Sequence, residues 1–356
     1  MFYLSVFFIA LAASAVLTFS VRRLALYFNI LDRPDIEDRR EGERGRKIHF
    51  QPVPLLGGLA IFIAYFGLLF LWAPHFLSGD LNFSHLAGFF AGALIIVIGG
   101  VLDDKYNLPP RWQIVFPLLA IIAVIAGGVE IARLSSPFGG QFDLGALFWL
   151  SPLLIAAWLL GMMYTTKLLD GVDGLVSGVG AIGGLVIFLF TLTTRYYQPD
   201  IALASLLLTG VALGFLFFNW HPAKIFLGES GSLLLGYILG VLAIISGGKI
   251  AIALLVMGIP ALDLVWTVGR RLWAGRNPFK FADREHLHHR LLSLGLSQKK
   301  TVFIFYGLSL VFGLSGLFLQ SRGKLWALVL LVLIMLAAVV GLRNRRDSGD
   351  RGKKDG

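Results

Sequence analysis

Residues 201–218 read IALASLLLTGVALGFLFF, without one charged side chain. An apolar helix of about 20 residues crosses a bilayer core, so this stretch predicts a transmembrane helix. Ten other apolar segments of similar length lie before and after it. The sequence therefore predicts an all-α fold, a polytopic membrane bundle of eleven helices. They are expected near residues 3–21, 55–73, 86–102, 114–132, 146–164, 174–194, 201–218, 231–247, 249–268, 301–320 and 325–342.

The composition agrees with a membrane-embedded protein. Of the 356 residues, 57% are hydrophobic and only 15% are charged, which lies outside the range of soluble globular proteins. The chain contains no cysteine, which excludes disulfides, thiolate metal sites and a cysteine nucleophile. A net charge of +10 could suggest a nucleic-acid partner. In a membrane protein, however, the placement of lysine and arginine in the loops matters more than their sum, so we expect no nucleic-acid partner.

Lysine and arginine are concentrated in alternate loops. Of the 31 such residues, 26 lie in six segments: 22–54, 103–113, 165–173, 219–230, 269–300 and 343–356. The positive-inside rule places these segments in the cytoplasm and the N-terminus outside. Residues 3–21, followed by Arg22-Arg23, have the charge order of an uncleaved anchor. We therefore expect one domain over residues 1–342 in a bacterial inner (plasma) membrane, with a basic, disordered cytoplasmic tail over 343–356.

The first motif with chemical character is Asp103-Asp104, at the cytoplasmic end of the third predicted span. Adjacent carboxylates repel, so either one has a raised pKa or both are held by a cation. Both states suit a base or a metal site beside a phosphate. The alternative is a solvated helix end with Lys105 as the counter-ion.

The second motif is KLLDGVDG, residues 167–174. Asp170 and Asp173 are three residues apart and are expected to share one helical face. Gly171 and Gly174 would let the backbone approach a ligand, and the helix that follows favours phosphate at its N-terminus. Alternatively, Asp173 only caps that helix.

The third motif is NWHPAKIFLGESGS, residues 219–232. It combines the Asn219 amide, the Phe226 ring, the Glu229 carboxylate and a Gly/Ser turn before a helix. These groups suit a nucleotide, through bonds to the base edge, base stacking, and metal and phosphate contacts. An ordinary loop that caps the eighth span is the alternative.

The fourth motif is DREHLHHR, residues 283–290. In a short helix, His286, His289 and Arg290 would line one face, with His288 turned away. The nearby arginines disfavour zinc and favour phosphate. An interfacial basic helix is the alternative.

The fifth motif is RKIH, residues 46–49, followed by Pro52, Pro54 and Gly57-Gly58. By itself it is typical of a positively charged flank on the cytoplasmic side. Together, the five motifs place carboxylates and cations on one membrane face. This indicates a metal–diphosphate site that faces the cytoplasm beside lipid.

The order of these motifs resembles the polyprenyl-phosphate N-acetylhexosamine-1-phosphate transferase superfamily (glycosyltransferase family 4) over nearly the whole chain. The stretches LDGVDGL, FLGESGS and HLHHRL carry the resemblance. The His-x-His-His form is similar to the branch that uses UDP-N-acetylglucosamine to begin O-antigen or teichoic-acid synthesis. It is less similar to the branch that makes the first peptidoglycan lipid, which has three consecutive histidines.

The resemblance implies that a lipid phosphate attacks the β-phosphorus of a UDP-sugar and releases UMP, with Mg²⁺, or alternatively Mn²⁺, neutralising the diphosphate. It implies a metal site at Asp170 and Glu229. The catalytic residues that it implies are Asp103, Asp104 and Asp173, the base being Asp103 or Asp104. Phe226 would stack on uracil. The full substrate-binding set is Lys47, His49, Lys167, Asn219, Phe226, His286, His288, His289 and Arg290.

Two positions depart from the family pattern, which usually has Asp at Glu229 and Asn at Lys167. These departures leave the donor sugar open, including UDP-N-acetylmuramoyl-pentapeptide. A rival of another class, a transporter or lipid flippase, predicts ionisable groups deep in several spans. Asp263 is the single candidate for such a group. A homodimer stays open.

Overall fold

The architecture is a bundle of helices, seen in a computed structural model that describes residues 1–34, 51–72, 82–136, 138, 140–144, 149–193, 197–247, 250–275 and 286–352. The longer helices are α1 (Phe2–Tyr27), α3 (Gly57–Leu71), α5 (Phe83–Tyr106), α7 (Val115–Ala126), α8 (Leu150–Leu169), α9 (Leu175–Thr191), α10 (Pro199–Asn219), α11 (Gly228–Ile245), α13 (Gly258–Trp273), α15 (Gln298–Phe318) and α16 (Ser321–Gly352). The short ones are α6 (Pro110–Gln113), α12 (Ile250–Val256) and α14 (Leu287–Ser293).

Two short antiparallel strand pairs accompany the helices, and the sequence did not predict them. Strand β1 (Leu31–Asp32) pairs with β2 (Val53–Pro54), between α1 and α3. Strand β3 (Arg133–Ser135) pairs with β4 (Gln141–Asp143), between α7 and α8. Because each strand has only two or three residues, the helices determine the fold, and its all-α class is confirmed.

The helices identify a multi-pass membrane protein. Within the described residues, six helices are long and apolar enough to cross a bilayer, or seven if α12 and α13 form one span. Shorter apolar helices cover Gly57–Leu71, Pro110–Ala126 and Leu175–Thr191. A helix overlaps each of the eleven segments that the sequence predicts as spans.

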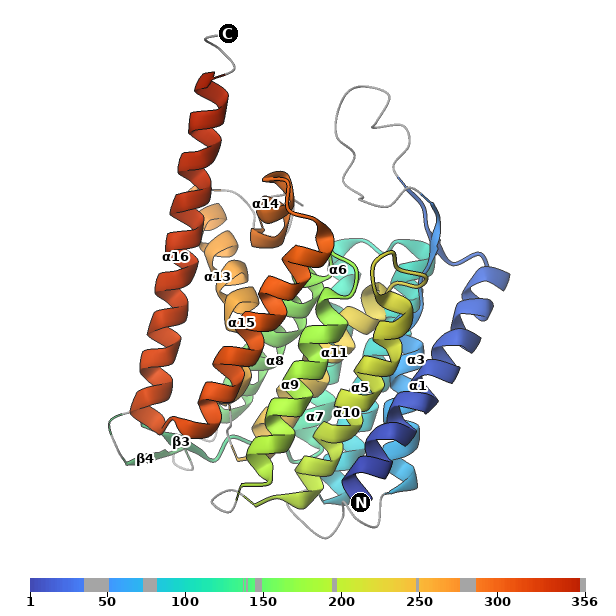
Figure 1. The fold of residues 1–356 in the computed structure, drawn as a ribbon. Coiled ribbons are helices and arrows are strands. Elements are labelled where there is room, and N and C mark those ends of the chain that lie inside the picture. The colour runs from blue at the N-terminus through green and yellow to red at the C-terminus, as the bar shows by residue number, and fades with distance from the viewer. Residues whose placement is uncertain are drawn as a thin grey trace.

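The ninth predicted span, residues 249–268, is not a straight helix. It is divided into α12 and α13, which meet at an angle of 85°. Pro260 lies in the first turn of α13. Proline lacks a backbone N–H and its ring clashes with the preceding turn, so a continuous helix is broken there. After the bend, α13 runs toward the end of the bundle that carries α14 (Figure 1).

Helices α10 and α11 form the centre of the bundle, because 78% and 83% of the residues in their apolar 18-residue stretches are buried. Helix α10 packs against α1 and α9, and α11 packs against α5 and α8. The N-terminus of α11 approaches its neighbours closely. A Cβ atom on Gly58 would lie 2.2 Å from the Gly231 nitrogen, and one on Gly100 would lie 2.3 Å from the Ser230 backbone. Glycine at these two positions therefore allows α3 and α5 to hold the start of α11.

The two ends of the chain lie at opposite ends of the bundle. Figure 1 shows α1 beginning at the lower end, and α16 ending beyond the upper end, where α6 and α14 also lie. Helix α16 continues to Gly352, whereas the sequence predicts a disordered tail from residue 343. An existing helix is extended at the gain of one backbone hydrogen bond per residue, and arginine is a good helix former.

Candidate active site

The described parts of the predicted motifs lie toward the upper end of the bundle, the end that carries α6 and α14 (Figure 1). Three helix ends supply most of the polar groups: the C-termini of α5 and α8 and the N-terminus of α11. Close packing of these ends brings the first three motifs together. The site is therefore built on the ends of rigid helices.

The segment before α11 is seated on the start of α3. The backbone N–H of Phe226 donates to the Pro54 oxygen at 2.8 Å. Gly57 and Gly58 donate to the oxygens of Phe226 and Leu227 at 3.1 and 2.9 Å. The Pro/Gly part of the fifth motif thus anchors the third motif by backbone hydrogen bonds. The motif's Lys47 and His49 lie outside the described residues.

Asp104 combines a bound oxygen with an unpaired one. Its Oδ1 accepts a hydrogen bond from the Glu229 backbone N–H at 2.9 Å. Its Oδ2 is buried and accepts no hydrogen bond from any described residue. A side chain at Gly228 would collide with this carboxylate, and Gly228 has φ 72°. A buried carboxylate oxygen is costly to leave unpaired, so this oxygen is an open ligand or base position.

Asp103, in contrast, is committed to its own turn. Its Oδ1 accepts from the Leu108 backbone N–H at 2.8 Å and from Gln113 Nε2 at 3.1 Å. Asn107, with φ 50°, ends α5 and turns the chain back. Asp103 therefore holds the turn between α5 and α6.

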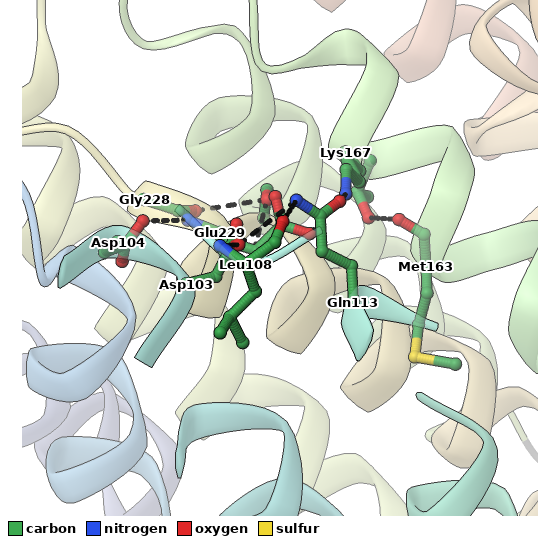
Figure 2. A network of polar contacts seen from close by, with 10 residues as sticks. Asp103, Asp104, Leu108, Gln113, Met163, Lys167, Gly228 and Glu229 are labelled. Carbon is green, nitrogen blue, oxygen red and sulfur yellow. Dashed lines mark hydrogen bonds and ion pairs between the residues drawn. The ribbon is translucent and has the colours of Figure 1, made fainter. Parts of the chain in front are cut away.

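Lys167 and Glu229 form an ion pair at the centre of the network in Figure 2. Their side chains are 24% and 15% exposed. Lys167 Nζ also donates to Gln113 Oε1 at 3.1 Å. The two positions that depart from the family pattern, Lys167 and Glu229, therefore contact each other.

Asp170 ends α8, and its carboxylate accepts no hydrogen bond from any described residue. The chain from Asp170 to Gly174 is a turn, so Asp170 and Asp173 do not share a helical face as expected. Gly174, with φ 78°, breaks the helix there. Burial and the charges of Glu229 and Asp173 raise the pKa of Asp170 to about 8.

Asp173 anchors the turn that leads to the third motif. Its Oδ2 lies 2.7 Å from His221 Nδ1 and accepts from the Ala223 backbone N–H at 3.1 Å. It does not cap α9, where Gly174 is the N-cap residue. Asp173 therefore fixes the second motif to the third.

Asn219 uses its whole amide inside the protein. Its Oδ1 accepts from the Gly174 backbone N–H at 3.1 Å and from Ser177 Oγ at 2.9 Å. Its Nδ2 donates to the Ile225 oxygen at 3.0 Å. Asn219 is 3% exposed, so it acts by joining the ends of α9 and α10 beneath the site.

The histidine motif is anchored on α13. His286 precedes α14 and places Nδ1 2.9 Å from Asp263 Oδ2. Asp263 Oδ1 accepts from the Leu287 backbone N–H at 3.2 Å. Because α13 is bent away from α12, Asp263 reaches α14, and this buried carboxylate aligns the motif.

His288 faces the protein, so the expectation that it is turned away is wrong. The ring is 1% exposed, stacks on His286 with centroids 5.8 Å apart, and lies against His289 at 4.3 Å. A Cβ atom on Gly171 would lie 2.7 Å from His288 Nε2. Burial and the neighbouring histidines lower the pKa of His288 well below its usual value, so the ring is neutral. It packs the histidine motif onto the Asp170 turn.

The carboxylates of this site fit a magnesium ion that is shared with a substrate. Among the described residues, no group of three His, Asp or Glu side chains can enclose a metal ion. Asp104 and Asp170 nevertheless have open oxygens and lie close enough for their charges to interact. Magnesium usually takes one or two carboxylates together with waters and substrate phosphates. Glu229, the other predicted ligand, shares its carboxylate with Lys167.

Three residues of the site were missed as functional residues from the sequence. Asp263 carried a usable signal, since a lone carboxylate in an apolar span is a functional candidate. His221 lies within the third motif but was assigned no role. Gln113 has no motif around it, and only the fold brings it to Lys167.

Known proteins are similar to this chain over most of its length. The profile of the family described as Glycosyl transferase family 4 matches residues 86–247. The chain is 31% identical over 353 residues to the probable undecaprenyl-phosphate N-acetylglucosaminyl 1-phosphate transferase of Bacillus subtilis, covering 96% of this chain and 92% of that protein.

Two further relatives are similar over most of their length. The decaprenyl-phosphate N-acetylglucosaminephosphotransferase of Mycobacterium tuberculosis is 33% identical over 84% of this chain and 80% of its own. The undecaprenyl-phosphate alpha-N-acetylglucosaminyl 1-phosphate transferase of Thermotoga maritima is 30% identical over 81% of each chain. On the strength of these near-complete alignments, the chain belongs to glycosyl transferase family 4.

Proposed function

We propose that the protein transfers N-acetylglucosamine-1-phosphate from UDP-N-acetylglucosamine to polyprenyl phosphate and releases UMP. The observation that carries this proposal is the group of open carboxylates, Asp104 and Asp170, beside the Lys167–Glu229 pair at the end of a membrane bundle. The relatives are named as transferases that act on undecaprenyl or decaprenyl phosphate with N-acetylglucosamine. Such a reaction would provide the first membrane step of a cell-envelope polysaccharide.

The reaction exchanges one phosphorus–oxygen bond for another. An oxygen of the lipid phosphate forms a bond to the β-phosphorus of the donor. The bond from that phosphorus to the oxygen shared with the α-phosphate breaks, and UMP leaves with that oxygen. Phosphoryl transfer of this kind depends on positioning and on stabilising the charge of the phosphate oxygens. Positive and metal-binding groups at the end of the bundle suit both tasks.

Asp104 is better suited than Asp103 to orient the lipid phosphate or accept its proton. The Oδ2 of Asp104 is unpaired among the described residues, whereas Asp103 already holds the Leu108 N–H and the Gln113 amide. Asp103 supports the site through the turn. This division leaves one carboxylate for the chemistry and one for the scaffold.

Asp170 would hold magnesium, with Glu229 contributing its second oxygen. When bound, the ion neutralises charge on the diphosphate and on the leaving UMP. Lys167 places a fixed ammonium beside the same carboxylates and stabilises negative charge on the phosphates. Because Glu229 shares its charge with Lys167, Asp170 would provide the principal protein ligand.

The donor nucleotide would lie between the third and fourth motifs. Phe226 offers a half-buried ring whose backbone is fixed to α3, and this suits stacking on uracil. His289 and Arg290 on α14 would contact phosphate, together with Lys47 and His49. His286 and His288 support these contacts from beneath. Loss of a stacking ring costs about 1–3 kcal/mol per base, so Phe226→Ala should raise KM for UDP-N-acetylglucosamine about ten-fold or more.

The bundle would cross the inner membrane eleven times, with the N-terminus outside and the active site in the cytoplasm. The opposite positions of α1's start and α16's end support an odd number of crossings (Figure 1). The basic segments 22–54 and 269–300 would resist translocation. Labelling of tags in these two segments from the outer face of intact cells would contradict this topology.

A panel of UDP-sugars tests the donor. Purified protein, undecaprenyl phosphate and Mg²⁺ are incubated with UDP-N-acetylglucosamine, UDP-N-acetylgalactosamine or UDP-N-acetylmuramoyl-pentapeptide, and UMP release is measured. We expect release with UDP-N-acetylglucosamine that depends on the lipid. Preference for the pentapeptide donor would identify the peptidoglycan reaction instead, and no lipid-dependent release with any donor would favour a transporter or flippase.

A further inference from the structure

We propose that Gln113 is a positioning residue for the transfer reaction. Its side-chain amide fixes Lys167 against Glu229 and, at the same time, fixes the α5–α6 turn through Asp103. The inference rests on the proposed function, and it assigns a role to a residue outside all five sequence motifs.

The geometry shows an amide whose two ends are both occupied. Gln113 Nε2 donates to Asp103 Oδ1 at 3.1 Å and to the Leu108 oxygen at 3.0 Å. Gln113 Oε1 accepts from Lys167 Nζ at 3.1 Å. The residue is half-buried and ends α6. Figure 2 shows its side chain between the Asp103 turn and Lys167.

An amide is the chemical group that this position requires. A carboxylate such as Asp103 accepts hydrogen bonds, whereas the ammonium of Lys167 only donates them. Gln113 presents two donors to the first side and an acceptor to the second. Turning the amide over would place its N–H groups against the ammonium and its oxygen against the carboxylate. The surrounding charges therefore fix the orientation of the amide.

Gln113 restricts where the lysine charge can go. A lysine side chain has a flexible four-carbon stem, and several carboxylates lie near this one. With Gln113 on one side and Glu229 on the other, the ammonium is held between α6, α8 and α11. Without Gln113, Lys167 keeps Glu229 but can also turn toward Asp170, away from the position that suits a donor phosphate. The expected loss is in the chemical step rather than in donor binding.

Gln113→Met tests this role, because it keeps the length of the side chain and removes the amide. We expect kcat to fall about ten-fold or more, the size of a charge-assisted hydrogen bond lost in the transition state. KM for UDP-N-acetylglucosamine should stay within about two-fold. Gln320→Met is the matched control, since Gln320 is exposed between α15 and α16, and it should leave both constants unchanged.

A double-mutant cycle shows whether Gln113 acts through Lys167. In a Lys167→Met background, Gln113→Met should lower the remaining kcat by less than about two-fold. If the two losses multiply, or if Gln113→Met alone raises KM without lowering kcat, the proposal is overturned. Transfer by the unchanged protein tests the proposed function separately, so multiplying losses in an active parent reject only the role of Gln113. Thermal unfolding in detergent shows whether each variant folds. If Gln113→Met does not fold, Gln113→Asn, which has a shorter side chain, takes its place.

Discussion

Replacing Lys167 with methionine is the perturbation that most directly probes the centre of the site. The change keeps the length of the side chain but removes the charge that faces Glu229. Both side chains are mostly buried, at 24% and 15% exposed, so solvent cannot fully compensate for the lost partner. A hydrogen bond to a charged group contributes about 1.5–3 kcal/mol, and an unpaired buried charge costs about 3–5 kcal/mol. For this partly solvated pair we expect a loss of about 2–3 kcal/mol.

Removing both charges should be less harmful than removing one. In Lys167→Met combined with Glu229→Gln, no carboxylate is left without its cation. The penalty for an uncompensated charge is then absent, so the unfolding free energy should fall by only about 1 kcal/mol relative to the unchanged protein. Lys299→Met is the matched control. Lys299 is exposed, and such surface changes stay within about 0.5 kcal/mol.

Thermal or denaturant unfolding in detergent, followed by tryptophan fluorescence, measures these differences. The chain has 8 tryptophans and no cysteine, so no labelling is needed. The reasoning is refuted if Lys167→Met is as stable as the control. It is also refuted if the double variant loses the sum of the two single losses.

Three other predictions follow from the contacts around Asp170 and the histidine motif. Because the pKa of Asp170 is raised to about 8, a proton competes with a metal ion for its carboxylate. The affinity for Mn²⁺, measured by electron paramagnetic resonance, should therefore strengthen as pH rises toward about 8, and Asp170→Asn should abolish this pH dependence. Gly171→Ala would place a Cβ atom 2.7 Å from His288 Nε2, so kcat should fall about ten-fold or more while the melting temperature stays near that of the parent. An unchanged kcat would mean that the contact between Gly171 and His288 does not affect catalysis. Asp263→Ala removes the hydrogen-bond partners of His286 Nδ1 and the Leu287 N–H, so it should lower the unfolding free energy by about 2–3 kcal/mol, and Asp263→Asn should lower it less. Equal losses in the two variants would show that the negative charge of Asp263 does not contribute to stability.

The helices were predictable because their signal is local. A run such as 201–218 is apolar throughout, and α10 forms there with both ends within two residues of the prediction. The bend between α12 and α13 was not predicted, since a proline in an apolar run is also tolerated inside membrane helices. Its consequence, the contact between Asp263 and His286, joins residues 23 apart in sequence.

The members of the site were more predictable than their geometry. Carboxylates such as Asp104 and Asp170 were identified by their spacing and by their position at span ends. Which of them stays open depends on the backbone N–H groups and side chains that approach from other helices. Gln113 shows the limit most clearly, because its partner Lys167 is 54 residues away and no local pattern connects the two.

The fate of the donor's β-phosphate tests the central claim most directly. UDP-N-acetylglucosamine labelled with ³²P at the β-phosphorus is incubated with the purified protein, undecaprenyl phosphate and Mg²⁺, and the lipid and aqueous phases are separated. Our account predicts that the label enters the lipid phase and that one unlabelled UMP is released for each labelled lipid. Label that remains in the aqueous phase as UDP, while the sugar enters the lipid, would contradict the transfer of a sugar-1-phosphate.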